Sequence, residues 1–170
     1  MHVLIAEDND INQKLLQRTF QKIGGCTFAI VGDGQQALDY LASPPTTCPR
    51  PDLILMDTAM PVMSGLEATR IIRTQPPFAT DAKLASTPII ALAPWAVRSD
   101  KERLAQQGFD DVLSKPIRLG HMGKMLLFWS RRRAVRRSGM PLSGRVVAIP
   151  PAAQWGPFPL RRFRGPRSLL

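Results

Sequence analysis

The feature that most constrains the fold is a run of four apolar residues, Leu53 to Met56, that ends directly in Asp57. Pro51 and Asp52 precede the run, and a segment with proline, serine and glycine follows it. Such a run predicts a strand that is buried on both faces, as in a parallel sheet covered by helices. At the end of such a strand a carboxylate emerges into the crevice where open parallel sheets bind ligands, and it requires a cation or a lysine beside it.

Two further segments supply charged groups at similar positions. The apolar run 2–6 is followed by Glu7 and Asp8, and a short run that starts at residue 112 ends in Lys115. If the three strands are parallel neighbours, three acids and one lysine converge. Three carboxylates repel one another unless a cation binds, and oxygen ligands with room for water suit Mg²⁺. The lysine would serve as a point charge for a phosphoryl oxygen.

Strand-like runs alternate with helical patterns over residues 1–130. The runs lie at 2–6, 26–31, 52–57, 88–92 and 112–114, and a segment that we expect to be helical follows each of them. This alternation predicts an α/β fold, a doubly wound five-stranded parallel sheet with helices on both faces. The strand order 2-1-3-4-5 would make the strands that lead to Asp8 and Asp57 neighbours. Two long loops, 44–51 and 74–87, are also expected.

The charge of the chain is unevenly distributed. Residues 1–130 contain 13 Lys and Arg and 13 Asp and Glu, whereas residues 131–170 contain ten Arg and no acidic residue. We therefore predict one domain at 1–130 and a basic Arg/Pro-rich tail at 131–170, which we expect to be disordered. Such a tail could make weak, salt-sensitive contacts with nucleic acid, although it contains no recognisable DNA-binding motif.

The sequence also indicates a compartment. The two cysteines, Cys26 and Cys48, do not make a disulfide framework, and no apolar run approaches the length of a membrane span. The N-terminus lacks the basic-then-apolar pattern of a secretory signal. We therefore predict a cytoplasmic protein that does not contact membranes, with the nucleus as an alternative compartment.

The set of motifs resembles the receiver domain of two-component response regulators, of the hybrid-kinase or eukaryotic type, over roughly residues 1–130. The matching segments are Glu7-Asp8-Asn9, the run from Met56 and Asp57 through Met60, Pro61 and Met63 to Gly65, Thr87 to Leu92, and Gly108 to Asp111 leading to Ser114-Lys115-Pro116. The resemblance implies a flavodoxin-like fold, phosphorylation of Asp57 and contact of Lys115 with the phosphoryl group. It implies a histidine kinase or a histidine phosphotransfer protein as partner. It also implies Mg²⁺ as cofactor, with these ligands: Glu7, Asp8, Asp57 and the backbone carbonyl of Ala59.

Two positions depart from the pattern of that family. Receivers normally carry a serine or threonine after the fourth strand and an aromatic residue three positions before the lysine, where this chain has Ala93 and Val112. In the family these two groups form the conformational switch, and Pro94 further removes a backbone N–H. Phosphorylation would remain possible while the conformational response is weakened. The alternative is that the conformational response is kept, either because the loop realigns or because the Ser99 hydroxyl takes the place of the missing one.

The sequence therefore predicts a receiver that accepts a phosphoryl group from phosphohistidine on Asp57 and that is not an enzyme with a separate substrate. The alternative is a degenerate receiver that binds a protein partner independently of phosphorylation. Nucleic-acid binding through the arginine-rich tail is a third and weaker hypothesis.

Overall fold

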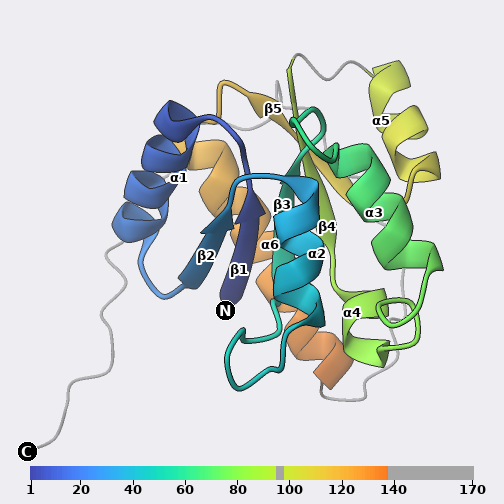
Figure 1. Cartoon of the computed structure of the whole chain (residues 1–170). Coiled ribbons are helices and arrows are strands. Elements are labelled where there is room, and N and C mark those ends of the chain that lie inside the picture. The colour runs from blue at the N-terminus through green and yellow to red at the C-terminus, as the bar shows by residue number, and fades with distance from the viewer. Residues whose placement is uncertain (95–97, 138–170) are drawn as a thin grey trace, which may run out of the picture.

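The computed structural model describes residues 1–94 and 98–137, without the side chains of residues 98–100 and 133–137. Within these ranges strands and helices alternate along the chain (Figure 1). The strands are β1 (His2–Ala6), β2 (Thr27–Val31), β3 (Leu53–Asp57), β4 (Ile89–Pro94) and β5 (Asp111–Lys115). The helices are α1 (Asp10–Ile23), α2 (Gly34–Ala42), α3 (Gly65–Thr74), α4 (Ala82–Ser86), α5 (Arg98–Gln106) and α6 (Leu119–Arg137).

The five strands form one parallel sheet in the order β2-β1-β3-β4-β5. This confirms the predicted α/β fold and its strand order. Since β1 and β3 are neighbours with Ala6 opposite Met56, the residues that follow them emerge side by side. The order of strands in the chain reverses between β1 and β3, which is the switch point where sheets of this class bind ligands.

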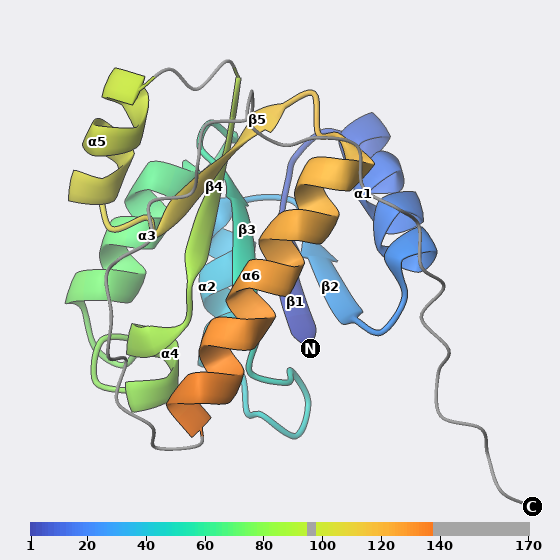
Figure 2. The ribbon, with the colours of Figure 1, turned by 180° about the vertical axis from the view of Figure 1, so that it is seen from behind.

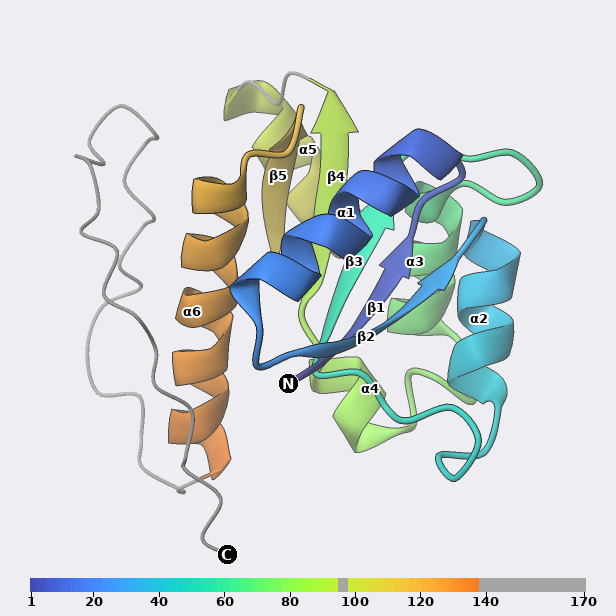
Figure 3. The ribbon, with the colours of Figure 1, turned by 90° about the vertical axis from the view of Figure 1, so that its left-hand side faces the viewer.

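Helices cover both faces of the sheet and bury two separate apolar layers. Helices α1 and α6 lie on one face, while α2 and α3 lie on the other (Figure 3). Figure 2 shows α6 running across its face of the sheet. Strand β3 is buried on both sides because Ile54 and Met56 pack into one layer and Leu53 and Leu55 into the other. The continuous apolar run before Asp57 is therefore explained by its central position in the sheet.

Side-chain caps set the starts of four helices. Asn9 accepts hydrogen bonds from the N–H groups of Ile11 and Asn12, at 3.0 and 3.1 Å, and so starts α1 directly after the acidic pair. The equivalent caps of α2, α3 and α4 are the side chains of Asp33, Ser64 and Asp81. These oxygens satisfy backbone donors that have no partner within the helix.

The structure differs from the sequence prediction in two segments. The predicted loop 74–87 contains the short helix α4, which Asp81 caps and whose Leu84 is buried. Strand β4 continues two residues past its predicted end, to Pro94. The basic run after residue 130 extends helix α6 as far as Arg137, and the domain boundary near residue 130 stays a prediction. Residues 138–170 lie outside the described residues, so the disordered tail stays a prediction.

No helix among the described residues has both the length and the apolar character needed to cross a membrane.

Candidate functional site

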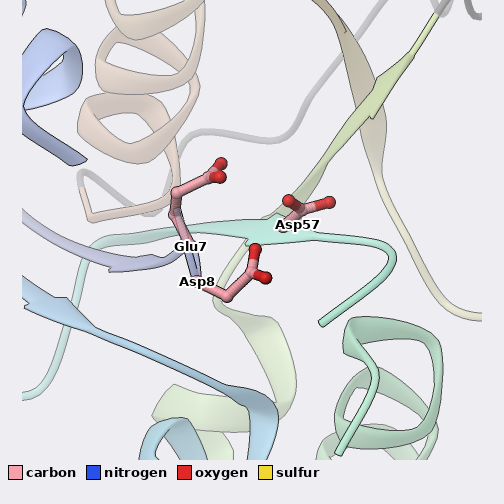
Figure 4. Close-up of side chains that lie close together, drawn as sticks. All are labelled: Glu7, Asp8 and Asp57. Atoms are coloured by element: carbon pink, nitrogen blue, oxygen red, sulfur yellow. The ribbon is translucent and has the colours of Figure 1, made fainter. Parts of the chain in front are cut away.

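Three acidic side chains meet where β1 and β3 end. Glu7 and Asp8 directly follow β1, and Asp57 is the last residue of β3. One carboxylate oxygen from each of the three residues lies within 4.8 Å of the other two (Figure 4). The predicted convergence of these acids is therefore present in the structure, and it follows from the parallel pairing of the two strands.

Lys115, the last residue of β5, reaches the same place. Its Nζ lies 2.7 Å from Glu7 Oε2 and also donates a hydrogen bond to Asp57 Oδ2. Burial alone would lower the pKa of Lys115, but the hydrogen bonds and negative charges of Asp57 and Glu7 outweigh it and raise that pKa. Lys115 is thus a fixed ammonium that bridges two carboxylates.

The acids differ in their exposure and in their other partners. Glu7 is fully buried and Asp57 is buried, whereas Asp8 is exposed. The second oxygen of Glu7, Oε1, accepts a hydrogen bond from Asn12 Nδ2 at 2.8 Å, and Asp57 Oδ1 accepts one from the Ala59 N–H at 3.2 Å. Buried carboxylates stay charged only with such partners. Sequence reasoning assigned no role to Asn12, although it lies at the start of the helix that follows the acids.

The donor set fits Mg²⁺. Three carboxylates and one ammonium leave two negative charges uncompensated, which a divalent cation would balance. Mg²⁺ uses one or two carboxylates and keeps several waters, and the exposed Asp8 leaves access for them. Ala59 is exposed in the loop after β3, and the ligand role of its carbonyl stays a prediction.

We expect Asp8→Ala to have opposite effects on metal binding and on stability. Loss of a carboxylate should weaken Mg²⁺ binding by about tenfold or more. Relief of repulsion should raise the free energy of unfolding of the metal-free protein by roughly 0.5 kcal/mol. Calorimetric Mg²⁺ titration and denaturant unfolding measure both effects, with Asp10→Ala as the control because Asp10 is an exposed acid outside the cluster. Unchanged Mg²⁺ affinity in Asp8→Ala would contradict the assignment.

The loop between β3 and α3 is held in an unusual backbone conformation. Val62 has a φ of 66° and is 87% exposed. A β-branched residue in this left-handed region is strained, and its exposure means that packing does not offset the strain. The backbone of the loop after Asp57 is therefore strained at Val62, and packing of the Val62 side chain does not compensate for this strain.

Val62→Asn should relieve this strain. Asparagine tolerates the left-handed region, so we expect the free energy of unfolding to rise by about 1 kcal/mol. Val62→Ala is the matched control, because it removes the apolar bulk but keeps a Cβ atom, and it should gain less. Denaturant unfolding measures both variants. Equal gains in the two variants would show that the backbone conformation is not the cause.

The two residues at the predicted switch positions lie in the strands β4 and β5. Ala93 is buried in β4, directly after the residue that pairs with Asp57, and Val112 is half-buried in β5 opposite Ala91. Neither side chain carries a hydroxyl group or an aromatic ring. The Ser99 side chain lies outside the described residues, so its predicted alternative role is untested.

Comparison with known proteins agrees with this geometry. The family model described as the response regulator receiver domain matches residues 3–127. A hybrid signal transduction histidine kinase from Dictyostelium discoideum is 43% identical over 116 residues, which are 68% of this chain but only 6% of that protein. The polar-differentiation response regulator DivK from Brucella anthropi is 37% identical over 115 residues, covering 68% of this chain and 84% of DivK.

Solved structures give the same result. The receiver domain of a sensor histidine kinase from Pseudomonas aeruginosa, with a magnesium ion coordinated in its active-site cleft, has a TM-score of 0.61 and 33% identity, covering 75% of this chain and 95% of that one. The receiver domain of the yeast (Saccharomyces cerevisiae) response regulator Ssk1, crystallised with the histidine phosphotransfer protein Ypd1, has a TM-score of 0.67 and 30% identity, covering 79% and 91%. The chain belongs to the response regulator receiver domain family.

Proposed function

We propose that the chain is the phosphoacceptor of a two-component phosphorelay and that Asp57 takes a phosphoryl group from a phosphohistidine. The observation that carries this proposal is the pairing of Lys115 with both Asp57 and Glu7, next to the exposed Asp8. In the transfer an Asp57 oxygen forms a bond to phosphorus while the phosphorus–nitrogen bond of the donor breaks. The electron pair of that bond returns to the imidazole ring. The product is an acyl phosphate, and the chain is not an enzyme with a separate substrate.

Each charged residue has a role in this proposal. The ammonium of Lys115 would pair with a phosphoryl oxygen as the group arrives. Glu7 and Asp8 would hold Mg²⁺ mostly through water, and Asp57 and the carbonyl of Ala59 would be its other ligands. When bound, Mg²⁺ would offset the negative charge of the acids and of the phosphoryl group. The magnesium ion in the Pseudomonas aeruginosa receiver supports this assignment.

The proposed donor is a histidine kinase or a histidine phosphotransfer protein. The crystallised pair of Ypd1 and Ssk1 supports the second kind of partner, and the similarity to a hybrid kinase supports the first. Exposed apolar side chains lie on the segments that follow the acidic residues in the chain: Ile11 (76% exposed) and Leu15 (46%) on α1, and Val62 (87%) in the loop after β3. A donor that delivers a phosphoryl group to Asp57 would cover these side chains.

The proposed compartment is the cytoplasm, with the nucleus as the alternative. Cys26 and Cys48 are both free, which suits a reducing compartment. Contact between the arginine-rich tail and nucleic acid stays a prediction, because most of that tail lies outside the described residues.

A labelling experiment tests the phosphoacceptor role. With acetyl phosphate and Mg²⁺, the wild-type chain should gain a phosphoryl group that hydroxylamine removes, because an acyl phosphate is labile to that nucleophile. Asp57→Asn should take up none, and a chelator should prevent labelling of the wild type. Equal labelling of Asp57→Asn would refute the assignment of the acceptor.

A second candidate function, a degenerate receiver that binds partners without switching, is favoured by Ala93 and Val112. A bond from a hydroxyl to a charged phosphoryl oxygen contributes about 1.5–3 kcal/mol, and Ala93 cannot make it. Without this hydrogen bond, phosphorylation would stabilise one conformation over the other only weakly, and it would shift the equilibrium between the two conformations little.

We therefore expect a beryllofluoride mimic of phosphorylation to change amide hydrogen exchange little in α5, β5 and α6 of the wild type. The double variant Ala93→Thr with Val112→Tyr should show a larger change, because it restores the hydroxyl and the ring. If the double variant alone does not show the larger change, Pro94→Ala is added to it, because this substitution restores the backbone N–H that proline lacks. A wild-type response as large as that of the restored variant would eliminate the degenerate reading.

A further inference from the structure

The Glu7 carboxylate is held from both sides. Its Oε1 accepts a hydrogen bond from Asn12 Nδ2 at 2.8 Å, and its Oε2 lies 2.7 Å from Lys115 Nζ. Glu7 is 0% exposed, so water cannot replace either partner freely. The orientation of this carboxylate therefore depends on the Asn12 amide as well as on the lysine.

Asn12 is itself fixed by the start of α1. Its N–H donates to the capping side chain of Asn9 at 3.1 Å, and its side chain is half-buried. The next residue, Gln13, donates from Nε2 to the backbone carbonyl of Glu7 at 2.6 Å. Two consecutive residues of α1 thus hold Glu7, but only Asn12 contacts the carboxylate.

Lys115 needs an anchor other than Asp57 during transfer. In the structure its ammonium pairs with Asp57 Oδ2 and with Glu7 Oε2. When a phosphoryl group binds to Asp57, the ammonium must move from the Asp57 oxygen to a phosphoryl oxygen. A fixed Glu7 carboxylate would keep the ammonium in place during this exchange, which preserves the geometry on which transfer rates depend.

We propose that Asn12 is a positioning residue for phosphoryl transfer: its amide orients Glu7, which in turn anchors Lys115 beside Asp57. This inference rests on the proposed phosphoacceptor function of Asp57. It requires a hydrogen-bond donor at position 12, which leucine lacks and which an ionised aspartate also lacks. Asn12→Leu and Asn12→Asp therefore both remove the donor and keep a side chain of similar size. The leucine side chain is apolar, whereas the aspartate side chain is charged.

The first measurement needs neither metal nor phosphodonor. The chain has three glutamates, Glu7, Glu67 and Glu102, so carbon-13 labelling of glutamate gives three side-chain carboxyl signals, of which Glu7→Gln identifies one. Asn12→Leu and Asn12→Asp should both move the Glu7 signal in the metal-free protein. Gln13→Leu is the matched control, because it removes a bond from the same turn of α1 to the Glu7 backbone, and it should leave that signal in place. A Glu7 signal that moves equally in the control would overturn the proposal.

The second measurement separates rate from metal binding. With acetyl phosphate at saturating Mg²⁺, Asn12→Leu and Asn12→Asp should each be phosphorylated about tenfold more slowly than the wild type. The Mg²⁺ concentration for half the maximal rate should change less than about threefold in Asn12→Leu, since Asp8 and Asp57 remain. Gln13→Leu should keep the wild-type rate within about twofold. An unchanged rate in both Asn12 variants would overturn the proposal.

A double-mutant cycle shows whether Asn12 acts through Glu7. In a Glu7→Ala background, Asn12→Leu should slow phosphorylation by less than about twofold further, because the oxygen that accepts the Asn12 hydrogen bond is gone. Independent, multiplicative effects would overturn the proposal. If Asn12→Leu does not fold, the near-isosteric Asn12→Asp carries the same comparison. If the wild type takes no label at all, the phosphoacceptor function fails, while the Glu7 carboxyl signal still decides whether Asn12 orients that side chain.

Discussion

Lys115→Met should destabilise the metal-free protein by about 3–5 kcal/mol, because it leaves the buried carboxylates of Glu7 and Asp57 without their cation. Addition of Mg²⁺ should stabilise the variant more than the wild type, since the metal would supply the missing positive charge. Thermal unfolding of both proteins, with and without Mg²⁺, measures the two effects. The raised pKa of Lys115 also determines how the loss of stability in Lys115→Met depends on pH.

A lysine whose pKa is raised by folding stabilises the folded state fully below its ordinary pKa of about 10.4, and this contribution is lost as pH rises through the folded pKa. The difference in free energy of unfolding between the wild type and Lys115→Met should therefore persist through neutral and mildly alkaline pH. It should shrink once the pH exceeds the ordinary lysine pKa of about 10.4. Lys83→Met is the control, because Lys83 is a more exposed lysine whose Nζ lies 3.9 Å from Asp52. It should cost about 1 kcal/mol or less. Equal losses in the two variants would contradict the bridging role of Lys115.

Gly65→Ala should also destabilise the protein strongly, by about 3 kcal/mol or more. A Cβ atom at position 65 would overlap the backbone carbonyl of Asp57 and press on the side chain of Met56. Helix α3 begins at Gly65 and lies directly against the end of β3, so backbone must move to make room. Because the obstacle is Asp57, the proposed acceptor, its phosphorylation rate should fall together with the stability of the protein.

Gly120→Ala is the matched control for this substitution. Gly120 is also in the first turn of a helix, α6, but a Cβ atom there would meet nothing within 4 Å. Alanine is the better helix former, so this variant should gain up to about 1 kcal/mol in denaturant unfolding. Tolerance of alanine at position 65 to the same degree would contradict the close approach of α3 to Asp57.

The sheet and the acidic cluster could be predicted because both depend on local patterns. The run from Leu53 to Met56 is short and apolar at every position, which favours a strand covered on both faces. Once the strands are parallel neighbours, the residues after them must meet at one edge. Glu7, Asp57 and Lys115 therefore lie together as the sequence indicated.

Other features depend on tertiary packing and left no clear pattern in the sequence. Helix α4 has five residues, too few to show a helical period, and only the cap Asp81 marks it. Helix α6 continues through the arginine run to Arg137, because arginine is a good helix former and a change of charge does not end a helix. The contact of Asn12 with Glu7 depends on how α1 is set against the sheet, and the left-handed conformation of Val62 opposes its own preference.

The most direct test of the phosphoacceptor function locates the modified residue chemically. The wild-type chain is treated with acetyl phosphate and Mg²⁺ and then reduced with borohydride, which converts an aspartyl phosphate into homoserine, and the peptides are sequenced by mass spectrometry. We predict homoserine at position 57 only, and none when Mg²⁺ is chelated. Homoserine at another acid such as Asp8, or none at any position in the presence of Mg²⁺, would contradict the phosphoacceptor function of Asp57.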